Sequence, residues 1–216
     1  MVCSVMSDVF DKIIPSLRGL RTRIVCPHPF VRDLLLTQIL IPSFSDRRIF
    51  LMIYSEALYR RFVKFSENRL DDVELYVIKV GKRPECRVGR LFAFVEQGDP
   101  RREANDLIRV LDKLGAEDVL IMHSSMGFFF ELLGDDNIRE ILEMFSILPP
   151  DITLVGFKSG ERTIDSLINE LYDVIIRIER DENMLDKNYY TITVEWTFKD
   201  YSIEFGRFRV RRGRID

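Results

Sequence analysis

The chain has 216 residues, of which 46% are hydrophobic and 31% are charged, and its formal net charge is −3. This composition is sufficient for one compact domain with a substantial core, and the small net charge does not steer the whole protein toward nucleic acid or anionic membrane. Cys3, Cys26 and Cys86 are few, odd in number and far apart. That spacing favours reduced thiols over a disulfide scaffold.

Membrane insertion and secretion are not expected. The first lysine is Lys12, so the N-terminus has no basic region of a signal peptide. No uncharged apolar run approaches the roughly 18 residues that span a bilayer. We therefore expect a cytoplasmic protein. Only two glutamines accompany the abundant Arg, Lys, Glu and Asp, a composition typical of thermophiles.

Hydrophobic periodicity predicts alternating helices and strands along most of the chain. A helix over residues 5–14 ends or kinks at Pro15, a strand covers 23–26, and Pro29 begins a helix that Pro42 stops, with His28 as its cap. Further strands are expected at residues 49–54, 73–80, 87–95, 119–122, 152–155 and 174–178, and further helices at 56–68, 99–115, 126–148 and 163–171.

The pattern changes after Asp186. Residues 189–197 and 201–211 have the alternation of two long strands around Lys199 and Asp200, which predicts an antiparallel hairpin. The preceding β-α units predict a mostly parallel sheet. We expect one α/β domain over residues 1–216, with 1–19 as an N-terminal helical arm.

This layout resembles the RecA/KaiC-like branch of the P-loop ATPases over about residues 20–215. "RIVCPHPFVRDLL" stands where the family has its Walker A loop, "IYSEA" where a strand ends in acidic residues, and "VLIMHSSMG" at the Walker B strand. "DSLINELYDVIIRIE" and "YSIEFGRFRVRRGRI" are similar to the family's last helix and strand and to its closing hairpin. Through "VELYVIKVG" and "RVGRL" the chain resembles more closely a small archaeal family of KaiC-like fold. The resemblance implies a three-layer α/β/α fold with a mostly parallel central sheet.

The Walker A position lacks the residues that grip phosphate. That loop needs G-x-x-x-x-G-K-[ST], whose glycines let backbone N–H groups cradle the anion. On the frame of residues 26–33, Cys26 and Val31 replace the glycines, Arg32 replaces Lys, and Asp33 replaces the hydroxyl residue. Pro27 and Pro29 donate no N–H. We therefore expect no ordinary ATP binding and no bound cofactor.

The Walker B position agrees with this expectation. His123 follows "VLIM" where an Asp would hold magnesium, and a neutral imidazole prefers softer metals. Glu56 is the one residue that could still orient a water. The favoured interpretation is a carboxylate stabilised by the helix dipole at the start of a helix.

Two groups of residues allow other functions. Cys26, His28, Glu56, His123 and Ser124 are expected near the carboxyl ends of parallel strands, where α/β proteins bind ligands. A metal site or a Cys-His enzyme using a Cys26/His28/His123 cleft is therefore an alternative. Ordinary core packing and capping explain the same residues.

The C-terminal tail carries Arg207, Arg209, Arg211, Arg212 and Arg214. The resemblance implies a contact with a neighbouring subunit, for which Arg209, Arg211 and Arg212 are the candidates. A solvated edge strand is the simpler interpretation, and DNA binding by a recombinase-like accessory protein is a third hypothesis. Phe128, Phe129 and Phe130 suggest either helix packing or a self-association surface.

The leading hypothesis is a RecA/KaiC-like domain without ATPase activity that acts as a binding, regulatory or assembly protein. We expect a homo-oligomer or a protein partner.

Overall fold

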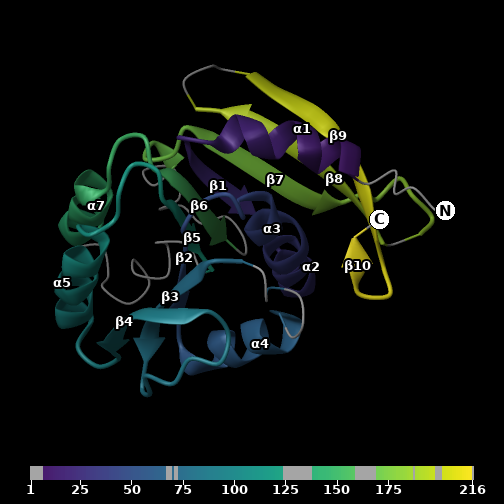
Figure 1. Cartoon of the computed structure of the whole chain (residues 1–216). Helices are drawn as coiled ribbons and strands as arrows, with labels where there is room; N and C mark the ends of the chain where they lie inside the picture. Colours follow the sequence, from purple (N-terminus) through teal and green to yellow (C-terminus); the bar gives the residue numbers. More distant parts are fainter. Residues whose placement is uncertain are drawn as a thin grey trace.

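A ten-stranded sheet forms the centre of the computed structural model, with strand order β10-β9-β8-β7-β1-β6-β5-β2-β3-β4 (Figure 1). The structure describes residues 7–66, 70, 73–123, 138–158, 169–186, 188–197 and 201–215. The strands are β1 (Arg21–Val25), β2 (Ile49–Tyr54), β3 (Leu75–Gly81), β4 (Arg90–Glu96), β5 (Val119–Met122), β6 (Thr153–Lys158), β7 (Val174–Arg180), β8 (Tyr189–Trp196), β9 (Tyr201–Arg211) and β10 (Arg214–Ile215).

The strands from β7 to β4 in that order pair in parallel, whereas β7, β8, β9 and β10 pair antiparallel. The predicted α/β class, mostly parallel sheet and C-terminal hairpin are therefore confirmed. The strand expected over 87–95 begins at Arg90 and pairs with β3. The carboxyl ends of β1, β5 and β2 meet at one edge, where ligands bind in open α/β sheets.

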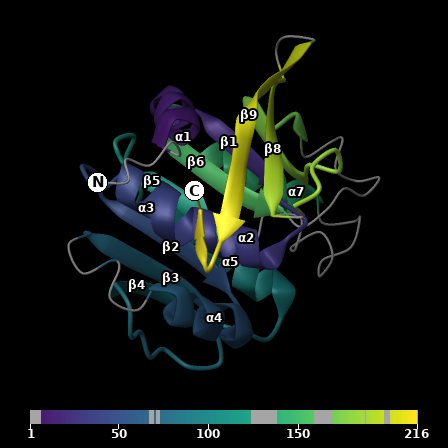
Figure 2. The same ribbon diagram turned by 90° about the vertical axis from the view of Figure 1, so that its right-hand side faces the viewer.

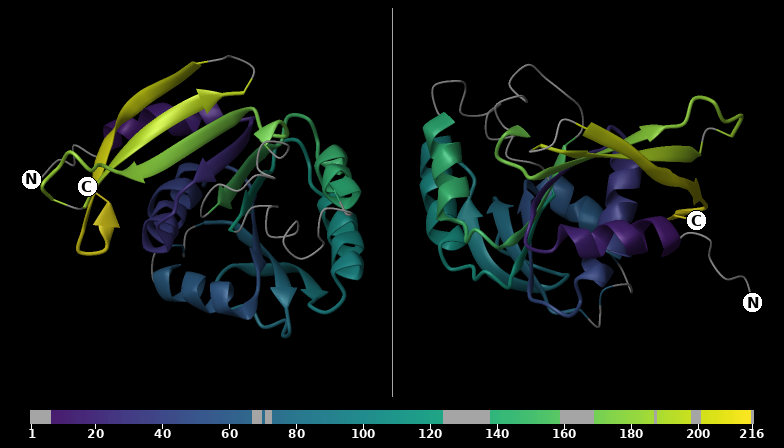
Figure 3. Two further views of the ribbon diagram at one scale, coloured as in Figure 1. Left: turned by 180° about the vertical axis from the view of Figure 1, so that it is seen from behind. Right: turned by 90° about the horizontal axis from the view of Figure 1, so that it is seen from above.

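Helices cover both faces of the sheet (Figures 2 and 3). They are α1 (Ser7–Ile13) with the 3₁₀ turn η1 (Ile14–Leu17), α2 (Pro29–Leu34) continuing through the π-helical η2 (Leu35–Leu40) into α3 (Ile41–Ser43), α4 (Glu56–Ser66), α5 (Pro100–Leu111) and α7 (Ile138–Ile147). On one face pack α1 with η1, the continuous segment from α2 to α3, and α4. On the other face pack α5 and α7.

Two hydrophobic clusters lie on opposite faces of the sheet. Every residue of β2 is buried, as a continuous "IFLMIY" run requires for a strand covered on both faces. Alternate residues feed opposite clusters: Leu51 packs toward α4, and Met52 packs toward α5. Packing on both faces thus fixes the positions of the carboxyl ends of the central strands.

The N-terminal helix packs on the C-terminal hairpin. Phe10 contacts Phe208 edge to face, with ring centroids 5.4 Å apart. A Cβ on Gly206 would lie 2.9 Å from Val9 Cγ2, so glycine permits this close approach. The helix predicted over 5–14 is present from Ser7, and the chain changes to the 3₁₀ turn beside Pro15.

Some predictions fall outside the described residues: Cys3, Ser124 and the three phenylalanines at 128–130, and most of the helices expected over 126–148 and 163–171. Of the first of these helices, α7 is described. None of the helices in the described ranges combines the length and the apolar character that a bilayer crossing demands.

Candidate functional site

The β1–α2 connection is a short turn rather than a phosphate-binding loop. Cys26 N donates to Lys158 O at 2.8 Å, and Arg32 N donates to His28 O at 3.1 Å, so α2 begins at Pro29. A nest of inward backbone N–H groups needs left-handed residues. None of residues 26–33 has a positive φ. The turn therefore offers no cradle for phosphate.

Cys26 and Val31, at the glycine positions of the Walker A frame, are core residues. Cys26 is fully buried and its thiol donates to His28 O at 3.6 Å. Burial raises the pKa of this thiol to about 11, so it is protonated at neutral pH. Val31 is 1% exposed and packs in the cluster beneath α2. Both residues therefore belong to the core.

Asp33 of α2, His123 after β5 and Arg61 of α4 form a polar cluster in which Arg61 is partly exposed. Oδ1 of Asp33 lies 3.1 Å from Nε2 of His123, and Oδ2 accepts a hydrogen bond from Nε of Arg61. Asp33 is 1% exposed and His123 is fully buried. His123 is fixed at the end of β5 because its N–H donates to Met52 O at 3.0 Å. We refer to these three residues as the Asp33 cluster.

Burial determines the protonation of His123. It lowers the pKa of His123, although the hydrogen bond with Asp33 acts in the opposite direction. The imidazole is therefore neutral at pH 7. Because a carboxylate only accepts hydrogen bonds, Nε2 of His123 carries the proton that it donates. The guanidinium of Arg61 supplies the positive charge that balances Asp33.

Arg32, at the lysine position of the frame, lies inside the protein. It is 5% exposed, and burial lowers its pKa while the neighbouring Asp33 raises it. It belongs to α2, one residue before Asp33. Its position in the helix places it within the packed layer between α2 and the sheet.

Glu56 participates in a separate group. It begins α4 directly after Ser55, whose φ of 96° makes the sharp turn from β2. Its Oε1 lies 3.1 Å from Nζ of Lys79 and accepts from Arg83 N at 3.3 Å. Within the described ranges, no hydrogen bond or ion pair joins Glu56 to the Asp33 cluster. Its carboxylate thus connects the start of α4 to β3 and to the segment that follows β3.

The Cys26, His28 and His123 side chains have different partners. The His28 ring packs edge to face on Tyr190 at 5.4 Å, and the residue occupies the N-cap position without a side-chain capping bond. Burial, with a smaller effect of Arg180, lowers its pKa. No group of three potential metal ligands occurs among the residues that the structure describes.

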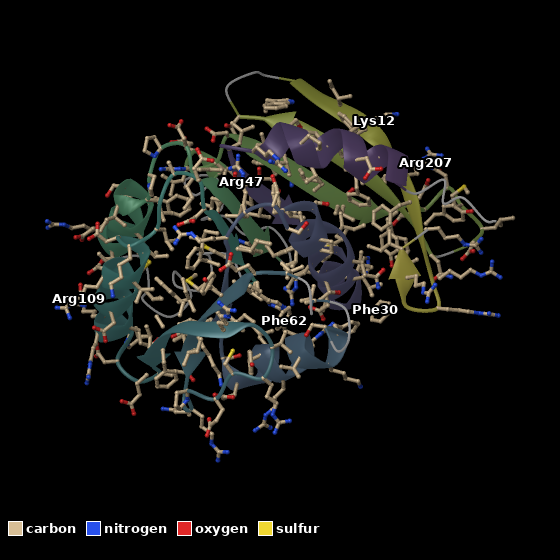
Figure 4. The ribbon with its side chains drawn as sticks, in the orientation of Figure 1. Lys12, Phe30, Arg47, Phe62, Arg109 and Arg207 are labelled. Atoms are coloured by element: carbon tan, nitrogen blue, oxygen red, sulfur yellow. The ribbon has the colours of Figure 1, made fainter. Side chains whose placement is uncertain are left out.

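The C-terminal arginines line the outer face of β9. Phe208 and Val210 point into the core, as the alternation predicts. Arg207 lies 3.1 Å from Asp181, and Arg209 pairs with Asp186 and covers the Tyr189 ring. Figure 4 shows Arg207 at this edge of the molecule. Arg211 and Arg212 are exposed.

Sequence reasoning missed Arg61 and Lys79. Arg61 gave no signal, because an arginine in an amphipathic helix is ordinarily solvated. Lys79 did give one: it is the single charge within the apolar run "LYVIKVG" of β3. A lysine in a buried strand needs a partner, and Glu56 provides it.

The comparisons with known proteins show the fold. No protein-family model matches the chain, and no curated protein does so. Three solved structures from Pyrococcus horikoshii are similar. PH0250 has a TM-score of 0.60 at 15% identity, over 88% of this chain and 93% of its own. The KaiC-like protein PH0186 has a TM-score of 0.60 at 11% identity, over 92% and 89%. The uncharacterized protein PH0321, in complex with an unknown peptide, has a TM-score of 0.53 at 12% identity, over 92% and 91%. The chain therefore has a KaiC-like fold.

Proposed function

We propose that this chain is a RecA/KaiC-like domain without ATPase activity that acts as a binding, regulatory or assembly protein. The observation that carries the proposal is the contact of Asp33 with both His123 and Arg61. In P-loop ATPases, the residues at the corresponding two positions hold Mg²⁺ beside the nucleotide phosphates. Here the carboxylate is already engaged by an imidazole and a guanidinium.

Two further features support the loss of nucleotide binding. The turn at residues 26–28 provides no left-handed residue for a phosphate nest. An added polyphosphate would also meet the Asp33 carboxylate. A like-charge pair at ~4 Å costs roughly 4 kcal/mol at an effective dielectric near 20. Mg²⁺ would have to displace both partners of Asp33 before it could relieve that repulsion.

A protein partner or a second copy is the proposed binding target. Ile203 and Phe205 are 46% and 39% exposed on β9, and Phe205 lies at an irregularity in the pairing of β8 with β9. The peptide bound to PH0321 is consistent with a binding role for this fold. Exposed apolar residues on a long edge strand are suited to pairing with another chain.

MgATP hydrolysis and solution mass test this proposal. We expect phosphate release at the background rate, and a species larger than the 25.5 kDa monomer or capture of a defined protein partner. ATP turnover that is lost in Arg32→Ala or Glu56→Gln would contradict the absence of activity. A strictly monomeric protein without a partner would contradict the assembly role.

A further inference from the structure

A second site, unrelated to the Walker positions, lies between α4 and the segment 82–87 that follows β3. It is a cleft of about 530 Å³, and Arg60, Lys64, Arg83 and Arg87 line it. This volume falls within the roughly 300–1,000 Å³ that small-molecule sites occupy. The cleft is therefore large enough for a small organic ligand with its charged groups.

Four of the cations that line the cleft are uncompensated. Arg60, Lys64, Arg83 and Arg87 are exposed, and their side chains have no hydrogen bond or ion pair in the part of the chain that the structure describes. With Lys79, Glu56 and Glu85, the lining has five cations and two carboxylates. The cleft thus carries a formal charge of +3 in a protein whose net charge is −3.

The floor of the cleft removes the negative charge that would repel an anion. Lys79 is 1% exposed, and its Nζ lies 3.1 Å from Glu56 Oε1 and 2.9 Å from Glu85 O. The ammonium also lies 4.4 Å from the centre of the Tyr59 ring, which is a cation–π contact. Glu56 is neutralised in this way, so four cations and the single carboxylate of Glu85 remain in the lining and its field is positive.

Two side chains of α4 hold the backbone of the opposite wall in place. Arg83 N donates to Glu56 Oε1 at 3.3 Å. The Tyr59 hydroxyl accepts from Arg87 N, and from Val88 N at 3.3 Å. Arg60 and Lys64 are one helical turn apart on α4, so they lie on the same face. The backbone that carries Arg83 and Arg87 is thus held beside α4, and such preorganisation lowers the cost of binding.

We propose that this cleft binds a small molecule that carries at least two phosphate groups. Arginine recognises phosphate through paired N–H donors, and the two walls provide one set of cations for each phosphate. The closed floor and the limited volume favour a small ligand over a nucleic acid strand. Binding here needs no Mg²⁺, because the protein supplies the positive charge.

Calorimetric titration with inorganic tripolyphosphate, at low salt and without Mg²⁺, tests the proposal. We expect saturable binding that weakens at least ~10-fold in Arg83→Glu/Arg87→Glu, since two charge-assisted contacts are lost. Arg101→Glu is the matched control, because Arg101 is exposed on α5, on the opposite face of the sheet. This control should bind within about twofold of the unmodified protein.

Several results would overturn the proposal. They are absence of binding at millimolar tripolyphosphate, an equal loss in the Arg101→Glu control, or tighter binding of citrate than of tripolyphosphate. Tighter binding of a single-stranded oligonucleotide, lost in the same double variant, would reassign the cleft to nucleic acid. All of these leave the absence of ATPase activity untouched, because that property depends on the Asp33 cluster.

Discussion

Arg60 and Arg61 are neighbours on α4, yet they lie in opposite electrostatic surroundings. Arg61 donates to the buried Asp33, whereas Arg60 faces the cleft with no ion-pair partner among the described residues. In the Asp33 cluster each charge is balanced inside the protein, so it contributes to the fold. In the cleft four cations have no such partner among the described residues, so they are available to a ligand. An arginine that is paired with a buried carboxylate contributes to the fold, whereas an arginine without such a partner is available to bind a ligand.

The largest effect is expected at Asp33. Asp33→Ala leaves the Arg61 guanidinium and the His123 ring without their shared acceptor, and breaking a buried pair in this way costs about 3 kcal/mol. Urea unfolding measures the loss. Asp106→Ala is the control, because Asp106 pairs with Arg109 at the surface at 3.4 Å, and such pairs are worth less than about 1 kcal/mol. Figure 4 shows Arg109 on the outer side of α5. Equal losses of unfolding free energy in the two variants would show that the Asp33 interactions contribute no more to stability than a surface ion pair.

The pH dependence of stability should report the buried histidine. The folded-state pKa of His123 lies below its ordinary value of 6.5, so the unfolded chain takes up a proton first as the pH falls. The stabilisation is complete above about pH 6.5 and is lost as the pH falls below it, with a slope of at most about 1.4 kcal/mol per pH unit for one histidine.

His123→Gln should flatten this slope. The pKa of His28 is also lowered by burial, but this ring is less buried, so His28→Gln is the matched variant with the smaller effect. The chain has only these two histidines. A slope between pH 7 and pH 5.5 that is unchanged in His123→Gln would show that His123 does not titrate as described.

Tyr59→Phe tests the connection between the two walls of the cleft. It removes the hydroxyl that accepts from Arg87 N and Val88 N, and we expect a loss of about 1 kcal/mol in unfolding free energy. The tripolyphosphate affinity should fall as well, because Arg87 loses its fixed backbone position. Unchanged affinity in a destabilised variant would show that the walls do not need this tie.

The smallest effect is expected at Arg60. Arg60→Ala should change the unfolding free energy by less than about 0.5 kcal/mol, as surface substitutions usually do, while it weakens tripolyphosphate binding. Arg61→Ala should show the reverse, with lower stability and unchanged binding. These two adjacent substitutions therefore separate the two regions within one turn of helix. Parallel effects of both on both quantities would contradict the separation.

The sequence predicted the strands well where burial is uniform. β2 and β5 have the bounds expected from "IFLMIY" and "VLIM", and Asp99 caps α5 through the N–H of Arg102 at 2.9 Å. The contact between Asp33 and His123 was not predicted from the sequence. Asp33 and His123 had been assigned to the Walker A and Walker B positions from the resemblance alone.

The partners of these residues were not predictable from the sequence. Whether Arg61 turns toward Asp33 depends on the packing of α4 beside α2, which no periodicity encodes. The cleft arises from the path of residues 82–87, a segment without regular structure. Local patterns identify buried strands and caps, whereas ion pairs between distant elements follow from the tertiary arrangement.

Calorimetric titration of the protein with ATP, in the presence and absence of Mg²⁺, tests the central claim most directly. If the Asp33 cluster occupies the metal position, Mg²⁺ adds nothing to any binding of ATP, and any residual affinity is lost in Arg83→Glu/Arg87→Glu. Micromolar binding that requires Mg²⁺ and is lost in Arg32→Ala would show that the Walker position still holds a nucleotide.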